Sequence, residues 1–159
     1  MFELTLIAFD DLVKVILQLV GIVAPIVALV TYRRNARIKR AEWLSSLHGK
    51  YFESANYKKI RLILDYAPPE LSTLRDAVEQ GGSDELVESF VDYLNFFEFI
   101  ASLWKLDQLR LDEVAMLFRY YLENLSHHTF VTSFIQKNGF ENLEELLAAL
   151  ARDRKAQRQ

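Results

Sequence analysis

An apolar run over residues 12–32 constrains this chain more than any other feature. Within residues 15–30, the only strongly polar side chain is that of Gln18. A helix rises about 1.5 Å per residue, so about 20 residues cross a hydrocarbon layer roughly 30 Å thick. The run reaches this length when Lys14, near its start, extends its ammonium group toward water. We therefore predict one transmembrane helix, with residues 1–32 as the membrane segment.

The apolar run ends in a basic segment, residues 33–40, with the sequence RRNARIKR. Its basic residues are Arg33, Arg34, Arg37, Lys39 and Arg40. Short basic flanks of membrane helices stay on the cytoplasmic side, where they match the anionic lipids of the inner leaflet. The opposite flank carries Glu3, Asp10 and Asp11 against Lys14 alone. We therefore expect the N-terminus outside and everything from residue 33 on in the cytoplasm.

Two other interpretations of the apolar run are weaker. A buried helix of a soluble protein seldom lacks a polar face over so long a stretch. A cleaved signal peptide has a basic segment before its apolar part and small residues at its end. Here no basic segment precedes the run, and Arg33 follows it.

One face of the predicted membrane helix is polar at one end and small in the middle. Its members alternate three and four residues apart, namely Asp11, Lys14, Gln18, Gly21, Pro25, Ala28 and Tyr32. Polar side chains in a bilayer require a protein partner or water, and small residues let helix backbones approach closely. We therefore predict a homo-oligomer in which this stripe faces neighbouring copies or lines a pore. The alternative is that Gln18 lies close enough to the outer interface to be tolerated alone.

The length, net charge and cysteine count of the chain restrict the chemistry that it can perform. The chain has 159 residues, a net charge of −3 and no cysteine. Disulfides, cysteine zinc sites and thiol nucleophiles are therefore excluded, and no strong overall attraction to nucleic acid is expected. We divide the chain into the membrane segment, a cytoplasmic helical domain over residues 33–151 and a basic tail over residues 152–159.

Residues after the basic segment keep a helical period throughout. One helix is expected to continue from the membrane to about His48, with Gly49 as a break. Further helices are expected at residues 57–64, 70–80, 83–104, 112–125, 126–139 and 142–150, with Asp112 and Asn142 as caps and Gly139 as a stop. No stretch alternates with period two. The fold class predicted is all-α, with the transmembrane helix continuing into a bundle of about five helices.

Motifs for cofactors and metals are missing from the sequence. The glycine pair in QGGSDE lacks the lysine and the preceding strand of a phosphate loop. His127 and His128 are adjacent, so their side chains diverge on a helix, and a third ligand would have to be His48 or a carboxylate. No strained Gly-x-Ser-x-Gly turn is present. We therefore expect no cofactor, no metal and no small-molecule substrate, and we do not expect an enzyme.

Glu98 interrupts the apolar sequence FFEF, and two interpretations compete. A buried carboxylate would have a raised pKa. We favour the alternative, in which Glu98 lies on the narrow polar side of its helix with Asn95 and meets a lysine or arginine from a neighbour.

The order of segments resembles a family of small bacterial single-pass membrane proteins with a HEPN-like helical domain. The resemblance lies in the basic segment, in LHGKYFESANYKKIRLILD, in DYLNFFEFIASLWKLDQLRLDEVAMLFRYYLENL and in FIQKNGFENLEELL. In plan the chain is similar to the CRISPR accessory membrane proteins that accompany RNA-targeting Cas effectors. The resemblance implies an oligomer in the bacterial inner membrane that permeabilises it in antiviral defence, with a Cas effector or RNA as partner.

Arg119 and His127 form the one pair that resembles the Arg/His pair of HEPN ribonucleases. Those enzymes place the two residues four to six positions apart, whereas seven residues intervene here. We therefore read Arg119 as a solvated or bridging arginine, and RNA contact or cleavage at this pair stays an alternative. A membrane-tethered adaptor that docks a cytoplasmic protein is the other alternative to a pore.

Overall fold

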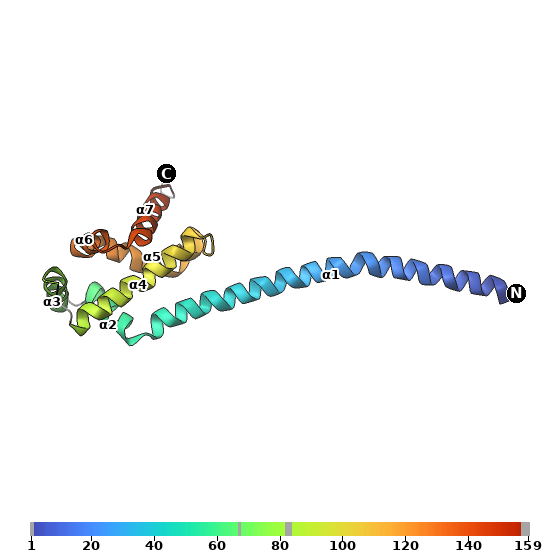
Figure 1. Ribbon diagram of the computed structural model, residues 1–159, viewed down its shortest axis with the longest axis horizontal. Helices are drawn as coiled ribbons and strands as arrows, with labels where there is room; N and C mark the ends of the chain where they lie inside the picture. Colours follow the sequence, from blue (N-terminus) through green and yellow to red (C-terminus); the bar gives the residue numbers. More distant parts are fainter. Residues whose placement is uncertain (1, 67, 82–83, 157–159) are drawn as a thin grey trace. The chain divides into compact units, whose positions relative to one another are not determined.

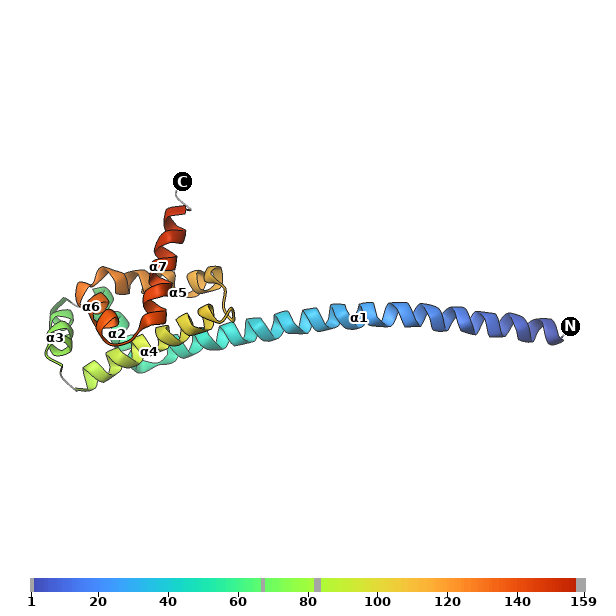
Figure 2. The same ribbon diagram turned by 45° about the horizontal axis from the view of Figure 1, so that its top comes forward.

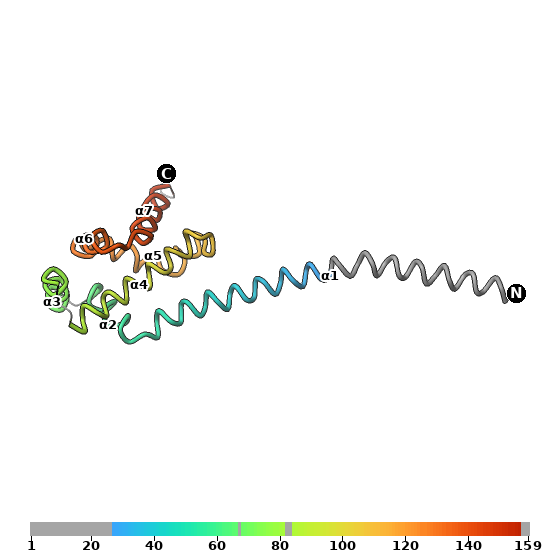
Figure 3. Tube along the Cα trace, in the orientation of Figure 1, coloured from blue at the N-terminus to red at the C-terminus, as the bar shows by residue number. Residues whose placement is uncertain are grey.

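The computed structural model describes the backbone of residues 2–66, 68–81 and 84–156, and the side chains of these residues from 27 on. Figure 3 shows the fully described part in colour. Every regular element in these ranges is a helix, and no strand occurs among them. The chain divides into two units, one ending at Leu47 and one beginning at His48. The prediction of an all-α fold is confirmed.

Seven helices are described, and Figure 1 labels them in chain order. They are α1 (Phe2–Glu53), α2 (Ala55–Tyr66), α3 (Pro68–Glu79), α4 (Glu85–Lys105), α5 (Leu111–His127), α6 (Thr129–Lys137) and α7 (Glu141–Ala156). The second unit begins within the last turns of α1 and holds the six helices from α2 to α7, one for each helical range predicted after the first helix. The first residues of the predicted basic tail continue α7.

Among the described side chains, no helix is both long enough and apolar enough to cross a membrane. Most of the predicted transmembrane helix, up to residue 26, lies outside the residues whose side chains are described. The backbone of α1 is helical throughout the predicted span.

The end of α1 differs from the prediction at Gly49. The helix passes through this glycine and ends at Glu53, because Tyr51 in its last turn is fully buried in the core of the second unit. The break falls at Ser54, whose Oγ accepts a hydrogen bond of 3.3 Å from the N–H of Tyr57. Ser54 thus supplies the first turn of α2 with an acceptor, as a serine before a helix does.

The start of α3 comes two residues earlier than the predicted Glu70. Pro68 and Pro69 form its first turn. Proline is tolerated there because the first N–H groups of a helix have no partner within it.

The helix boundaries around α5 and α6 are shifted from those predicted. Arg110 rather than Asp112 precedes α5, and its N–H donates a hydrogen bond of 2.8 Å to Glu113 Oε2. The helix passes through Ser126 and breaks at His128 instead. Gly139 has a φ of +79° after α6, so the predicted stop at this glycine is confirmed.

The central helix of the second unit is α4, which packs against α2, α3, α5 and α7. Figure 2 shows α7 beside α4, and Asn142 at the start of α7 contacts Glu98 and Ser102 in the second half of α4. The buried side chains of α4 lie on more than one side of the helix: Val87, Ser89, Phe90, Tyr93, Leu94, Phe96, Phe97, Ile100 and Ala101. Several helices therefore surround α4, as apolar side chains on two sides of one helix require.

An aromatic cluster around Tyr51 joins the end of α1 to α4 and α5. The Tyr51 ring lies 5.3 Å from the ring of Phe96 and 5.4 Å from that of Phe118. Its hydroxyl lies 2.9 Å from the hydroxyl of Tyr93, so one polar group satisfies the other inside the cluster. Burial raises the pKa of both tyrosines above the ordinary value, and they stay neutral.

Arg61 on α2 holds the end of α1 in this cluster. Its guanidinium donates hydrogen bonds of 3.2 Å to the carbonyl of Tyr51 and 3.4 Å to the carbonyl of Phe52. It also lies over both aromatic rings, 4.6 Å from each centroid. The last carbonyls of a helix have no partner within it. A buried cation therefore satisfies two of them and stacks on the rings beside them.

Glu98 on α4 has an unexpected partner, the N-terminus of α7. Its carboxylate accepts hydrogen bonds from the N–H of Asn142 at 3.3 Å and from the N–H of Leu143 at 2.8 Å. The Asn142 amide nitrogen donates to the same carboxylate at 2.6 Å. The expected lysine or arginine is replaced by the positive end of a helix, which attracts a carboxylate for the same electrostatic reason. The sequence predicted Asn142 as the cap of this helix, but in the structure Glu98 caps it and the N–H of Asn142 is one of its donors.

We expect Arg61→Met to lower the free energy of unfolding by about 2–4 kcal/mol, because the carbonyls of Tyr51 and Phe52 lose their donor and the rings lose their cation. Arg61→Lys should fall between this variant and the wild type, since an ammonium is a point donor without a planar fork. Urea unfolding of the detergent-solubilised chain, followed by tryptophan fluorescence, measures both. Equal stability of all three proteins would contradict this role of Arg61.

Glu98→Ala should lower the free energy of unfolding by about 1–3 kcal/mol, because the first N–H groups of α7 lose their acceptor. Glu98→Gln keeps one carboxamide oxygen as acceptor, so its loss should be smaller. Glu88→Ala, an exposed glutamate on the same helix, is the control. The cap is refuted if Glu98→Ala is no less stable than that control.

Candidate functional site

The basic segment forms part of α1 and is largely open to solvent. Arg33, Arg34, Arg37 and Lys39 are exposed, whereas Arg40 is half-buried and has an interaction partner. The residues just before it are apolar and equally open, with Val30 61% exposed and Tyr32 72% exposed. A helical stretch with apolar side chains followed by basic ones is therefore accessible to lipid or to another macromolecule.

Five of the seven residues of the predicted oligomer stripe fall outside the described side chains. This applies to Asp11, Lys14, Gln18, Gly21 and Pro25. Ala28, its last small residue, is described and exposed. Self-association through this stripe stays a prediction.

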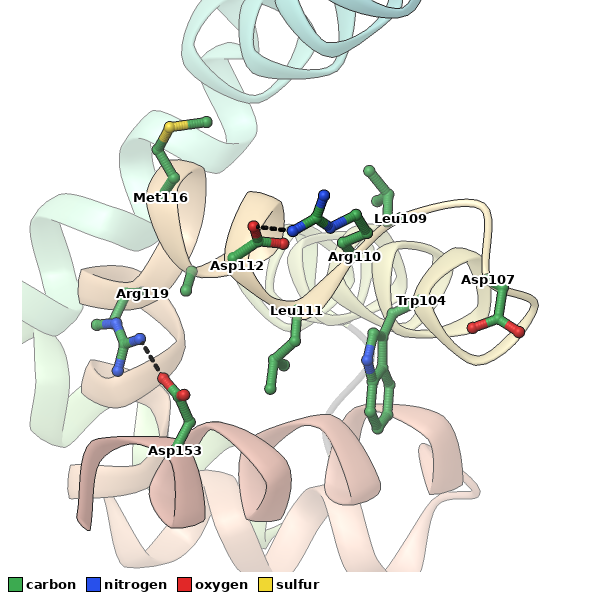
Figure 4. Close-up of a pocket in the computed structure, with 10 residues that line it drawn as sticks. Trp104, Asp107, Leu109, Arg110, Leu111, Asp112, Met116, Arg119 and Asp153 are labelled. Atoms are coloured by element: carbon green, nitrogen blue, oxygen red, sulfur yellow. Dashed lines mark hydrogen bonds and ion pairs between the residues drawn. The ribbon is translucent and has the colours of Figure 1, made fainter. Parts of the chain in front are cut away.

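Arg119 on α5 bridges to α7, as Figure 4 shows. Its Nη2 lies 2.7 Å from Asp153 Oδ2, and its Nη1 lies 3.9 Å from Glu123 Oε1. Glu123 Oε2 in turn lies 3.0 Å from Arg154 Nη1. We name these four residues the ion-pair strip. The interpretation of Arg119 as a bridging arginine is confirmed, because its charge is compensated by two carboxylates.

A hollow of about 760 Å³ adjoins one side of the ion-pair strip, between the start of α5, the preceding turn and α7. We name it the acidic hollow, since three aspartates and two arginines line it. The lining side chains are Trp104, Asp107, Leu109, Arg110, Leu111, Asp112, Ala115, Met116, Arg119 and Asp153. In Figure 4 the Trp104 indole and the Arg119–Asp153 pair stand on opposite sides of it. The second arginine is also paired, with Arg110 Nη2 2.6 Å from Asp112 Oδ2.

His127 does not share this hollow with Arg119. It is exposed and lines a second hollow of about 340 Å³ between α5 and α7. The hollow is otherwise lined by Leu122, Glu123, Ser126, Leu147, Leu150, Ala151, Arg154 and Lys155, and we name it the apolar hollow. RNA contact at Arg119 and His127 stays a prediction without a shared hollow for the two side chains.

The part of the chain that the structure describes contains no cluster of metal-ligating side chains. No group of three or more histidine, aspartate or glutamate side chains there could hold a metal ion. His128 is half-buried at the break between α5 and α6, and its Nε2 has no hydrogen-bond partner among the described residues.

A polar cluster between α2 and α5 was not anticipated from the sequence. Asp65 accepts a hydrogen bond of 2.5 Å from Asn124 Nδ2 and is hydrogen-bonded to the Tyr120 hydroxyl. Burial raises the pKa of Asp65, while the Tyr120 hydrogen bond and the charges of Arg61 and His128 act in the opposite direction. The nearby carboxylate in turn raises the pKa of Tyr120.

The polar contacts of Arg61 and Glu98 each had a signal in the sequence. Arg61 lies between Ile60 and Ile63, on the apolar side of its helix, where a charge requires a partner. Glu98 carried the same signal in FFEF. Neither signal names the partner, because both partners are backbone groups of another helix.

Comparison of the chain with protein-family models, with curated proteins and with solved structures gives no match. The resemblance to CRISPR accessory membrane proteins therefore stays a prediction.

Asp65 should make stability depend on pH. An acid whose pKa is raised by folding binds its proton more tightly in the folded state, so the stabilisation is complete below the ordinary pKa of about 4 and is lost as the pH rises through the raised value. Asp65→Asn removes this titration. We expect the unfolding free energy of Asp65→Asn relative to wild type to rise across the acidic range above about pH 4.

Urea titrations of the full-length protein at several pH values measure this difference. Asp76→Asn is the matched control, since Asp76 is exposed on α3 beside Arg75. A pH-independent difference between Asp65→Asn and wild type would contradict the perturbed carboxyl.

Proposed function

We propose that this protein is a single-pass protein of the bacterial inner membrane that self-associates and permeabilises the bilayer. The observation that carries the proposal is the apolar run over residues 12–32 and its abrupt change into an exposed basic segment. The resemblance stated above suggests antiviral defence as the setting.

The order of apolar and basic residues supports membrane insertion. Lysine and arginine beside an anionic leaflet contribute roughly 1 kcal/mol each. Four of the five basic residues in the segment are exposed in α1, and the apolar residues before them are exposed as well. The apolar residues of such a segment are suited to the hydrocarbon of a bilayer, and the basic residues that follow them are suited to its headgroups.

The amide of Gln18 supports self-association. A polar side chain in hydrocarbon requires a hydrogen-bond partner, and a single helix has none to offer at this position. Contact between copies along the stripe of Gln18, Gly21 and Pro25 would provide that partner or a shared water-filled lumen.

The cytoplasmic bundle would receive the signal that opens the assembly. A ligand shifts such an equilibrium only by its difference in affinity for the two states. In this proposal a partner protein or RNA binds the bundle more tightly in the open assembly than in the closed one.

Ion leakage in cells that express the chain tests the proposal, with a membrane-potential dye as readout and membrane fractionation as a second measurement. We expect the chain in the membrane fraction, and we expect Gln18→Leu to reduce leakage about threefold to tenfold, the range for one hydrogen bond between membrane helices. The double variant Gln18→Leu, Leu19→Gln keeps the composition but moves the amide to another face, so it should not restore leakage.

Three results would refute the proposal: an intact chain in the cytosolic fraction, no leakage from the wild type under activating conditions, or equal leakage from wild type and Gln18→Leu. An adaptor would behave differently, because replacing residues 12–32 by an unrelated membrane helix would leave its function intact.

A further inference from the structure

Two hollows of opposite net charge adjoin the ion-pair strip, one on each side of it, and we name the surface that contains the strip and both hollows the strip face. Arg119 and Asp153 line the acidic hollow, while Glu123 and Arg154 line the apolar hollow. The strip itself contains two arginines and two acids, so it is neutral. The two hollows therefore adjoin a common, neutral boundary.

The acidic side of the strip face presents an apolar projection. Met116 is 74% exposed and, as Figure 4 shows, projects from α5 at the rim of the acidic hollow. Asp112 lies one turn before it and is exposed, and Asp107 in the preceding turn is exposed as well. A large exposed apolar side chain beside carboxylates is suited to a partner that offers an apolar recess with basic groups around it.

The other side of the strip face offers such a recess. The apolar hollow has a volume of about 340 Å³, and Leu122, Leu147 and Leu150 form its apolar lining. Arg154 and Lys155 lie at its edge, and both are exposed. The exposed Met116 beside carboxylates is therefore complementary to the apolar hollow with basic side chains at its edge.

We propose that the bundle binds a second copy of itself through the strip face, with Met116 of each copy in the apolar hollow of the other. Asp112 of one copy faces Lys155 of its partner, and the reverse contact forms by symmetry. The proposal rests on the self-association that the proposed function requires, but it locates a contact in the cytoplasmic bundle rather than in the membrane.

A second copy is favoured over other partners because of symmetry. Two complementary patches on one face, separated by a neutral boundary, match each other when a copy is turned by a two-fold rotation. Both contacts then form at once, and each substitution acts twice. The carboxylates of the acidic hollow outnumber its arginines, and both arginines are paired, so a nucleic acid would meet net negative charge there.

Cysteine cross-linking tests the contact directly, because the chain contains no cysteine. One tagged copy carries Ala115→Cys, a small residue of the acidic hollow next to Met116, and a differently tagged copy carries Ala151→Cys, a small exposed residue of the apolar hollow. Both full-length variants are co-expressed and treated with a short bismaleimide. We expect a cross-linked product with both tags, and none when Ser133→Cys, exposed at another hollow, replaces Ala151→Cys.

Charge exchange provides the second measurement, on the same cysteine background. Asp112→Lys or Lys155→Glu should each weaken the dimer about tenfold, since two attractive pairs become repulsive. The two substitutions together in every copy should restore the cross-link. Lys137→Glu, exposed on α6, makes the same charge change elsewhere and should leave it unchanged.

Three outcomes decide between the hypotheses. A cross-link that Asp112→Lys weakens and the double exchange restores supports this contact. Absence of the cross-link in a chain that still has an oligomeric mass in detergent overturns it and leaves the proposed function standing. A cross-linked chain that neither enters membranes nor causes leakage supports the contact and refutes the proposed function.

Discussion

The packing of the bundle depends on the hydrogen bonds that Arg61 donates to the last carbonyls of α1. A long helix that ends inside a core leaves carbonyl groups without partners, and such groups are costly when they are removed from water. The guanidinium of Arg61 bonds the carbonyls of Tyr51 and Phe52 and covers their rings. The Tyr51 ring can therefore enter the core, where it meets side chains from α4 and α5.

The same requirement explains the other polar contacts between helices. Glu98 satisfies the first N–H groups of α7, and the Tyr51 and Tyr93 hydroxyls satisfy each other. In each case a buried or half-buried polar group finds its partner on another helix. Apolar side chains provide most of the burial in this bundle. The contacts of Arg61 with the end of α1 and of Glu98 with the start of α7 fix where these two helix ends lie in the bundle.

The sequence predicted the helices better than their ends. Gly139 stops a helix because its φ is positive, a conformation that other residues rarely adopt, so this boundary could be read from one residue. The breaks expected at Gly49 and Ser126 did not occur. Local preference of a glycine or serine is worth about 1 kcal/mol, and the burial of a ring such as that of Tyr51 outweighs it. For Arg119, the sequence indicated a bridging role, but it could not name Asp153, which lies 34 residues further along the chain.

By itself the sequence determined that every described regular element is helical, since a period near 3.6 in its apolar residues requires no contact between distant segments. It also determined the central place of α4, because apolar groups on two sides of one helix must be covered by neighbours. Only the tertiary structure decided the partners of Arg61, Glu98 and Asp65. These partners are backbone carbonyls, N–H groups, an amide and a hydroxyl, which all or many residues possess, so no pattern of side chains distinguishes them. They become available only when a particular helix end is brought to a particular side chain.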